Sequence, residues 1–215
     1  MRRDLIASIV AAVAFTVLFG LAYPLVTTGA AQLLFPGKAD GSRVERDGET
    51  VGSSLLAQSF TIRTEIPAGE RGKFGKKQTK RPDPDYFQPR PSVTGYSGDV
   101  TYFNNLGPNN KELSQLFRGY LDAYLALESP HTPGLDAADV PVDAVTTSAS
   151  GVDPHISVAN ARIQANRVAA SRGLSPDRVN ELVDEHTDDR DLGVLGEAGV
   201  NVVELNLALD EEVSR

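Results

Sequence analysis

The feature that most constrains this chain is an uninterrupted apolar run near its start. Residues 5–23 (LIASIVAAVAFTVLFGLAY) carry no charge, and after Asp4 the next charged residue is Lys38. A helix rises about 1.5 Å per residue, so this run would be about 28 Å long. The hydrocarbon core of a bilayer is about 30 Å thick. The sequence therefore predicts a single transmembrane helix, which we place at residues 5–26.

Tyr23 and Pro24 mark the far end of this span. Aromatic residues are common at the membrane interface, and Pro24 removes a backbone donor, so we expect the helix to end nearby. A cleaved signal peptide is the alternative, because Arg2 and Arg3 form a basic start and small residues follow at 28–31. The apolar run exceeds the about 7–15 residues of a signal-peptide core, which favours a retained anchor.

The short basic N-terminus predicts the orientation of the span. Long domains cross a membrane largely regardless of their charge, whereas a short basic terminus is usually held inside. We therefore expect residues 1–4 in the cytoplasm and residues 27–215 outside. The chain would then be a single-pass protein of the cell (plasma or inner) membrane with an extracytoplasmic domain.

The remaining composition is that of a globular domain without cysteine. Of the 215 residues, 40% are hydrophobic and 23% are charged, which excludes a disordered or collagen-like chain. The absence of cysteine excludes disulfides, cysteine-ligated zinc, iron–sulfur clusters and thiol catalysis.

Turn and cap signals divide the part after the span into elements of one small α+β domain. Asp47-Gly48 between two short polar segments predicts a β-hairpin within residues 42–53. A helix is expected to begin at Pro108 and to end before Pro130. Its apolar residues recur every three or four positions and are assigned to the core: Leu113, Leu116, Phe117, Tyr120, Leu121, Tyr124 and Leu125.

Two further helices are expected downstream. Ser157 is placed to cap a helix that ends at Gly173, and Ser175 to cap the next one. Residues 201–210 are ambiguous, because their apolar side chains alternate as in a strand while their start has the Asn-x-x-Glu spacing of a capping box. We favour a short helix there.

A basic tract interrupts the domain. Between residues 62 and 81 seven Lys or Arg residues accompany two acidic ones, in a chain of net charge −8. With three glycines and few apolar residues, residues 62–85 are interpreted as a flexible, solvated insert. Binding to anionic lipid headgroups or nucleic acid is the functional alternative. One short cluster with Phe74 as its aromatic supports that poorly, so we expect no nucleic-acid partner.

No motif for independent catalysis is present. The chain lacks the glycine-rich loops of nucleotide-binding proteins and the DKTGT sequence of P-type ATPases. His155 lies near Ser150 and Asp153, but a catalytic triad is normally assembled from distant segments, and no second ligand pair supports a metal. We expect a structural loop that His155 ties to a neighbouring segment. A membrane-anchored hydrolase using Ser150 and His155 is the alternative function, and an anchored ligand-binding module is a third.

The arginines divide into two groups by expected role. Arg162, Arg167 and Arg172 are offset along one predicted helix and are interpreted as a solvated face. Arg90 lies in a rigid Gln-Pro-Arg-Pro-Ser segment, which suits its guanidinium to a forked contact with a carboxylate or carbonyl. A contact within the fold is favoured over one across an interface.

Six segments carry a family resemblance, in order and over nearly the whole chain. They are residues 20–27 (GLAYPLVT), 52–60 (GSSLLAQSF), 86–92 (YFQPRPS), 105–109 (NLGPN), 141–157 (PVDAVTTSASGVDPHIS) and 200–210 (VNVVELNLALD). In these segments the chain resembles the KdpC family, the small single-span subunits of potassium-transporting P-type ATPases. Ala57 stands where the family usually has glycine, and residues 62–85 are longer than the family's usual link.

The resemblance implies a non-catalytic accessory subunit in the lipid bilayer. It would bind a KdpA-like channel subunit, a KdpB-like ATP-hydrolysing subunit and a small KdpF-like peptide, and it would stabilise their complex. It would either raise the pump's apparent affinity for ATP, acting as a catalytic chaperone, or cap the potassium entrance. ATP and potassium would be handled by the complex, with no catalytic residue, cofactor or metal assigned to this chain alone.

Two further points concern the cap and the motif residues. The 12 acidic and 3 basic residues of 177–215 would attract cations to an entrance, although a merely soluble acidic surface explains them as well.

The motif residues that we single out as interface or structural candidates are Tyr23, Pro24, Gln58, Phe60, Arg90, Pro91, Ser92, Asn105, Gly107, Pro108, Ser148, Ser150, Gly151, Asp153, Pro154, His155, Asn201 and Asn206.

Overall fold

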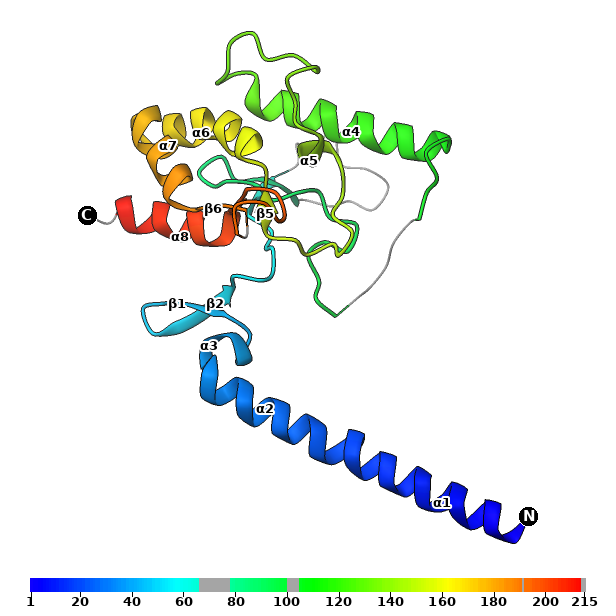
Figure 1. The fold of residues 1–215 in the computed structure, drawn as a ribbon. Coiled ribbons are helices and arrows are strands. Elements are labelled where there is room, and N and C mark those ends of the chain that lie inside the picture. The colour runs from blue at the N-terminus through cyan, green and yellow to red at the C-terminus, as the bar shows by residue number, and fades with distance from the viewer. Residues whose placement is uncertain (66–77, 100–104, 191, 214–215) are drawn as a thin grey trace. The chain divides into compact units, whose positions relative to one another are not determined.

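The computed structural model of the chain forms two compact units, Met1–Ser53 and Ser54–Arg215 (Figure 1). It describes residues 1–65, 78–99, 105–190 and 192–213. The first unit is an apolar helix followed by a β-hairpin, and the second contains several helices and small sheets. The predicted fold class, an N-terminal apolar helix followed by a small α+β domain, is confirmed.

One long helix opens the chain. It comprises α1 (Arg2–Val17), a π-helical turn η1 (Leu18–Ala22) and α2 (Tyr23–Leu34). The mean hydropathy of its most apolar window is 2.5, and none of that window is buried. The helix is therefore not the core helix of a soluble domain, and its 33 residues are long enough to cross a bilayer.

The helix continues through Pro24, where the sequence placed its end. Pro24 has no N–H, and its ring would clash with the carbonyl one turn back in a regular α-helix. The π-helical turn before it gives a wider path: the Tyr23 N–H donates to the Leu18 carbonyl, five residues back. Thr27 Oγ1 then donates to the Tyr23 carbonyl at 2.9 Å. The expected helix end near Pro24 is therefore wrong, whereas the lipid boundaries at residues 5–26 stay a prediction.

A hairpin follows the helix in the first unit. A short helix, α3 (Pro36–Ala39), leads into the antiparallel strands β1 (Arg43–Arg46) and β2 (Glu49–Ser53). Asp47 (φ 53°) and Gly48 (φ 81°) both have left-handed backbone, as a type I′ turn requires. The predicted Asp-Gly hairpin is confirmed.

Three helices and a small sheet form the core of the second unit. The helices are α6 (Val158–Arg172), α7 (Pro176–Glu185) and α8 (Val202–Val213). In the sheet, β7 (Gly199–Asn201) pairs antiparallel with both β5 (His155–Ile156) and β6 (Thr187–Asp188). α7 packs against both α6 and α8 (Figure 1). The core side chains include Phe87, Ile156, Val168, Val179, Val183, Val200, Leu205 and Leu209.

The predicted caps of α6 and α7 are present. Ser157 Oγ accepts from the Asn160 N–H at 3.1 Å, and Ser175 Oγ accepts from the Arg178 N–H at 3.2 Å. Gly173 ends α6 with a left-handed backbone at φ 70°. Short side chains and one glycine thus set both ends of α6, as local signals indicate.

The ambiguous C-terminal segment is helical after a short strand. Asn201 ends β7, and its Oδ1 accepts from the N–H groups of Val203 and Glu204 at 3.1 and 3.3 Å. This side chain therefore closes the first turn of α8. The favoured helix is confirmed.

The two ends of the basic insert form a paired ribbon. β3 (Thr61–Glu65) is antiparallel to β4 (Gln78–Pro82), with Ile62 opposite Arg81. The flexible insert predicted over residues 62–85 is therefore wrong at both ends, and residues 66–77 lie outside the described part. β-Branched residues such as Thr61, Ile62 and Thr64 favour extended backbone, a preference that the high charge of the tract masked.

The helix α4 (Lys111–Glu128) begins later than predicted. Asn110 Oδ1 accepts from the Glu112 N–H at 2.8 Å and caps it, so Pro108 lies in the preceding turn and not in the first helical turn. The predicted core stripe of α4 is only half-buried. Within α4, whose residues are all described, only Glu128 is fully buried.

Two glycine-to-alanine substitutions should shift the stability of the second unit in opposite directions. Gly173 has φ 70°, where a Cβ is strained, so Gly173→Ala should lower the free energy of unfolding by about 1 kcal/mol. Gly119 lies within α4, where a methyl group meets no atom within 4 Å, so Gly119→Ala should raise it by about 0.5–1 kcal/mol. Thermal unfolding of the full chain in detergent, followed by tyrosine near-ultraviolet circular dichroism, measures both. Shifts of the same sign would contradict this assignment of the two backbones.

Candidate functional site

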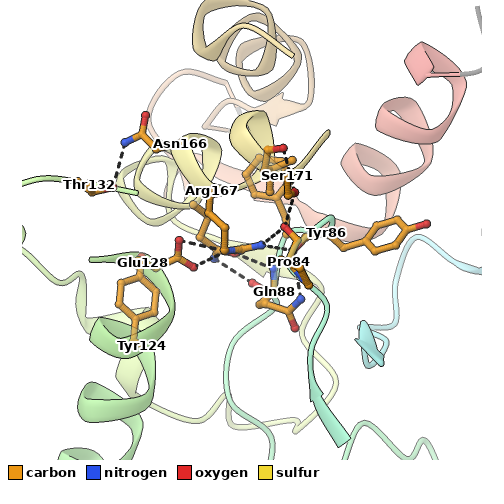
Figure 2. A network of polar contacts seen from close by, with 12 residues as sticks. Pro84, Tyr86, Gln88, Tyr124, Glu128, Thr132, Asn166, Arg167 and Ser171 are labelled. Atoms are coloured by element: carbon orange, nitrogen blue, oxygen red, sulfur yellow. Dashed lines mark hydrogen bonds and ion pairs between the residues drawn. The ribbon is translucent and has the colours of Figure 1, made fainter. Parts of the chain in front are cut away.

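A buried ion pair joins α4 to α6 in the second unit (Figure 2). Arg167 Nε donates to both carboxylate oxygens of Glu128, at 3.0 and 3.2 Å, and both side chains are 0% exposed. Arg167 Nη1 donates to the carbonyls of Pro84 and Tyr86 at 2.6 and 3.0 Å. Arg167 Nη2 donates to Gln164 Oε1 at 3.0 Å. One guanidinium thus fixes the turn at Pro84 and Asp85, and the irregular segment that follows it, against α6.

The ion pair is coupled electrostatically to its surroundings. Burial raises the pKa of the Glu128 carboxyl, and the adjacent Arg167 guanidinium opposes that rise. Burial, together with the nearby Glu128 charge, raises the pKa of the Tyr124 hydroxyl above its usual range. Because removal of either partner leaves a buried charge uncompensated, Glu128 and Arg167 act as one structural unit.

Two amide side chains pair with the backbone of this irregular segment as a neighbouring strand would. Asn206 Oδ1 accepts from the Phe87 N–H at 2.9 Å, and Asn206 Nδ2 donates to the Phe87 carbonyl at 3.0 Å. Gln164 pairs with the N–H and carbonyl of Gln88 in the same way, at 2.7 and 3.1 Å. None of the described strands pairs with Phe87 or Gln88, so these four bonds satisfy their backbone N–H and carbonyl groups. Irregular backbone can therefore be buried inside the fold.

Tyr86 and Arg172 close the other side of this segment. The Arg172 guanidinium carbon lies 4.6 Å from the centre of the Tyr86 ring. The Phe60 ring stacks on the Tyr86 ring, with 5.5 Å between the two ring centres. Arg172 Nη2 donates to Asp210 Oδ1 at 2.8 Å, and Tyr86 Oη donates to Asp210 Oδ2 at 3.2 Å. The candidate Phe60 therefore supports Tyr86, and α8 is tied to α6 through Asp210.

The predicted solvated face of three arginines is wrong for two of them. Arg162 is 57% exposed at its side chain and pairs with the exposed Asp184. Arg167 is fully buried, and Arg172 is 8% exposed at its side chain. The contacts of both come from segments far away in sequence, which helical spacing alone does not reveal.

Arg90 holds the loop that precedes β5. Its Nη1 lies 3.5 Å from Asp153 Oδ2, and its Nη2 donates to Thr146 Oγ1 and to the Thr147 carbonyl, both at 3.3 Å. The internal contact with a carboxylate and a carbonyl, which the sequence favoured, is present. Arg90 Nε is buried, and no hydrogen-bond partner for it lies among the described residues.

Ser92 and Gly151 lie against each other beside this contact. Ser92 Oγ donates to the Gly151 carbonyl at 2.6 Å. Gly151 has φ 74°, and a Cβ there would lie 2.8 Å from Thr94 Oγ1. Glycine is therefore required at this position both by its backbone and by the close approach of Thr94.

Asp143 joins the short helix α5 (Val142–Val145) to the start of α6. Its carboxylate accepts from the Ser157 N–H and hydroxyl at 2.9 and 2.7 Å, and from Asn160 Nδ2 at 2.9 Å. A carboxylate is stabilised at a helix N-terminus by the unpaired N–H groups there. Tyr124 Oη donates to Asn160 Oδ1 at 2.9 Å, which extends the network to α4.

His155 lies between two carboxylates. Its Nδ1 is 3.5 Å from Asp153 Oδ1, and its Nε2 is 3.4 Å from Asp188 Oδ2 on β6. The hydrogen bond with Asp153 raises the pKa of His155, against the effect of burial, and it also lowers the pKa of Asp153. The expected tie between this loop and a neighbouring segment is present.

Ser150 and His155 do not form the dyad that the hydrolase alternative requires. Ser150 Oγ accepts from the Val152 N–H at 3.2 Å, and within the described residues no hydrogen bond joins Ser150 to His155. The described residues also contain no cluster of three or more His, Cys, Asp or Glu suited to a metal ion. The polar residues of this loop bond its own backbone and Arg90.

The other candidates are spread over the chain. Asn201 Nδ2 donates to the Ser54 carbonyl at 2.8 Å, and the Pro154 carbonyl accepts from the Val202 N–H at 3.0 Å. Ser148 is buried, with its carbonyl accepting from the Gly151 N–H. Three exposed candidates lie in the segment before α4: Asn105, Gly107 and Pro108. Tyr23 and Pro24 belong to the first unit. Gln58 and Pro91 are half-buried.

Sequence reasoning missed the polar residues that organise the centre of the second unit: Glu128, Asn160, Gln164 and Arg167. Two signals were available. Glu128 follows Tyr124 and Leu125 by four and three positions, so it continues the apolar stripe of α4. Arg167 shares its helix with the buried Ala161, Ala165 and Val168. A charge on an otherwise apolar face points to a buried partner.

Comparison with known proteins identifies the family of this chain. The sequence model of the family described as "KdpC: K+-transporting ATPase, c chain" matches residues 5–211. The chain belongs to the KdpC family. Its match to this family includes both the apolar helix and nearly all of the second unit.

Named relatives are similar to this chain over nearly their full length. A Polaromonas naphthalenivorans protein is 46% identical over 213 residues, which are 98% of this chain and 95% of that protein. Relatives from Rhodospirillum rubrum and Mycobacterium tuberculosis are 45% and 42% identical, each over 98% of this chain and 97% and 99% of their own length. All three are named potassium-transporting ATPase KdpC subunits. The resemblance seen in the KdpC motifs is confirmed.

Replacing Arg167 should destabilise the second unit far more than replacing Arg162 on the same helix. Arg167→Met leaves the Glu128 carboxylate buried without a cation, so we expect a loss of about 3–5 kcal/mol in the free energy of unfolding. The matched control Arg162→Met removes an exposed pair and should cost less than about 0.5 kcal/mol.

The double variant Glu128→Met with Arg167→Met should lose less stability than Arg167→Met alone, because it buries no charge. Urea unfolding of the full chain in detergent measures all three variants. An Arg167→Met loss no larger than that of Arg162→Met would show that the pair is not structural.

The stability contribution of His155 should depend on pH. Its pKa is raised above 6.5 in the folded chain, so the folded chain binds the proton more tightly than the unfolded chain. The contribution is therefore complete below about pH 6.5 and is lost as pH rises through the folded pKa. The lowered pKa of Asp153 keeps that partner ionised in this window.

We expect His155→Gln to lower the melting temperature most at pH 5–6 and least at pH 8. Melting curves of the wild-type chain and the variant across this range measure the effect. His131→Gln, which replaces an exposed histidine, is the control. A His155→Gln difference that grows towards pH 8 would reverse the sign and exclude the charged contact.

Proposed function

We propose that this chain is a membrane-anchored, non-catalytic accessory subunit of an ATP-driven potassium-uptake complex. The observation that carries the proposal is the extent of the family match, which covers residues 5–211. The relatives are named as subunits of a potassium-transporting ATPase and are matched over 95–99% of their own length. A subunit role thus rests on the whole architecture and not on one shared motif.

The apolar helix supports the anchoring part of the proposal. Its most apolar window is unburied in the fold, so lipid or other membrane helices are needed to cover it. The short N-terminal segment with Arg2 and Arg3 favours a cytoplasmic N-terminus, which would place the second unit outside. In this orientation the second unit faces the compartment from which potassium is taken up.

The use of the polar side chains supports a non-catalytic role. Arg90, Asp153, Ser92 and Asn206 bind backbone or side chains of the same unit, and Ser150 is not paired with His155. ATP and potassium are then handled by the other subunits. The proposed partners are a channel-like subunit, an ATP-hydrolysing subunit and a small peptide, all resembling the Kdp proteins.

Assembly and coupling are the contributions that this architecture supports. A second unit outside the membrane does not reach nucleotide in the cytoplasm, so an effect on ATP affinity must be conformational and must pass through the membrane-spanning parts. A cap over the potassium entrance is the second contribution. The acidic residues of the C-terminal region, 177–215, would raise the local cation concentration, an effect that falls with added salt.

Co-purification and ATP titration test this function. The purified chain should hydrolyse no ATP alone, and its tagged form should retain the channel-like and ATP-hydrolysing subunits from detergent-extracted membranes. Complex prepared without the chain should need more ATP for half-maximal hydrolysis, by about 5–150-fold for a typical coupling free energy of 1–3 kcal/mol. A tagged wild-type chain that retains neither subunit would exclude the function.

A further inference from the structure

The loop between β6 and β7 carries apolar side chains that the fold leaves in solvent. Leu192 is 90% exposed, Val194 is 74% exposed and Leu195 is 57% exposed. Burial of one such side chain is worth about 1.5–3 kcal/mol. Single exposed apolar residues are ordinary on a protein surface, but three within four positions form a patch that binding would cover.

Contacts between described residues restrain the loop on both sides of the apolar tip. Arg190 Nη2 donates to Glu197 Oε2 at 2.6 Å and so joins the two arms of the loop. The Gly193 N–H donates to the Arg190 carbonyl at 2.9 Å in a tight turn. Leu192 has φ 54°, a left-handed backbone that costs a leucine on the order of 1 kcal/mol. The apolar side chains thus lie between Arg190 and Glu197, which are joined to each other.

An acidic hollow adjoins the exposed side chains. It has a volume of about 520 Å³ and is lined by Asp153, His155, Asp188, Asp189, Leu195, Gly196, Glu197 and Gly199. Arg90 forms an ion pair with Asp153, and Arg190 forms one with Glu197. His155 contacts Asp153 and Asp188. Among the described residues Asp189 makes no ion pair. Four carboxylates against two arginines leave the hollow negative.

We propose that the loop tip, residues 192–195, docks into an apolar socket on another protein subunit, with a basic side chain of that subunit entering the acidic hollow. The proposal rests on the proposed function, since it names the surface by which the chain would bind a partner of the complex. Apolar contact would supply the affinity, and the opposite charges would orient the two surfaces.

The charge around the tip selects a protein partner over two other occupants. A loop that inserts into a membrane of anionic lipid is favoured by flanking Lys and Arg, whereas Asp188, Asp189 and Glu197 would be repelled there. A second copy that docked through the same loop would bring two negative hollows together, which is also unfavourable.

Serine substitutions at the tip test the proposal in the complete complex. The full chain with Leu192→Ser and Val194→Ser, co-expressed with the other subunits, should retain at least about tenfold less partner in a detergent pull-down. Its near-ultraviolet melting curve should match the wild type, because both side chains are exposed in the fold. Val142→Ser is the matched control, since Val142 is 73% exposed elsewhere on the same unit. It should retain the partner fully.

A substitution that reverses a charge in the acidic hollow tests the proposal independently. Asp189→Lys should reduce partner retention more at low salt than at high salt, because screening weakens the repulsion from a basic partner group. Wild-type retention by the Leu192/Val194 double variant in detergent would overturn the proposal. If that variant then lost association only in membrane vesicles, the loop would be a lipid contact instead. Failure of the wild-type chain to retain any subunit would count against the proposed function, not against this loop.

Discussion

The second unit depends on a buried ion pair, Glu128–Arg167, that holds a segment with no regular structure. Neither Glu128 nor Arg167 retains contact with water, so their attraction must offset a large desolvation cost. It does so because the guanidinium also donates to Gln164 and to two backbone carbonyls, which uses its donors in fixed directions. A well-packed apolar pair would give similar stability, but it would not fix the register of the segment starting at Pro84.

The fixed register is transmitted along this segment towards the loop before β5. Asn206 and Gln164 pair with the next two residues, Phe87 and Gln88, and the chain then reaches Arg90. A shift by one residue would exchange the buried Phe87 for a polar neighbour and would move Arg90 away from Asp153. The family motifs around these positions are therefore explained by how they bind one another.

Local signals predicted local structure, and they failed where distant contacts decide. The Asp47-Gly48 turn, the serine caps of α6 and α7 and the apolar helix depend on neighbours in sequence, and all are present. Arg167 was misplaced because Glu128 lies 39 residues earlier in sequence. The β3–β4 ribbon was missed because strand pairing depends on a partner segment, and the helix end at Pro24 was wrong because a π-helical turn absorbs the clash.

The division into two units also affects how strongly the second unit must bind its partner for docking to occur. In the proposed arrangement, the apolar helix keeps the second unit in the same membrane as its partners, so docking becomes effectively intramolecular. The local concentration for such a contact is set by the connection at Ser53 and Ser54, and not by the amount of protein in the cell. A small apolar loop then suffices to bias one conformation of the complex, provided that the loop binds that conformation more tightly than the others. The proposed coupling to ATP hydrolysis across the membrane would require only that difference in affinity, and no contact with nucleotide.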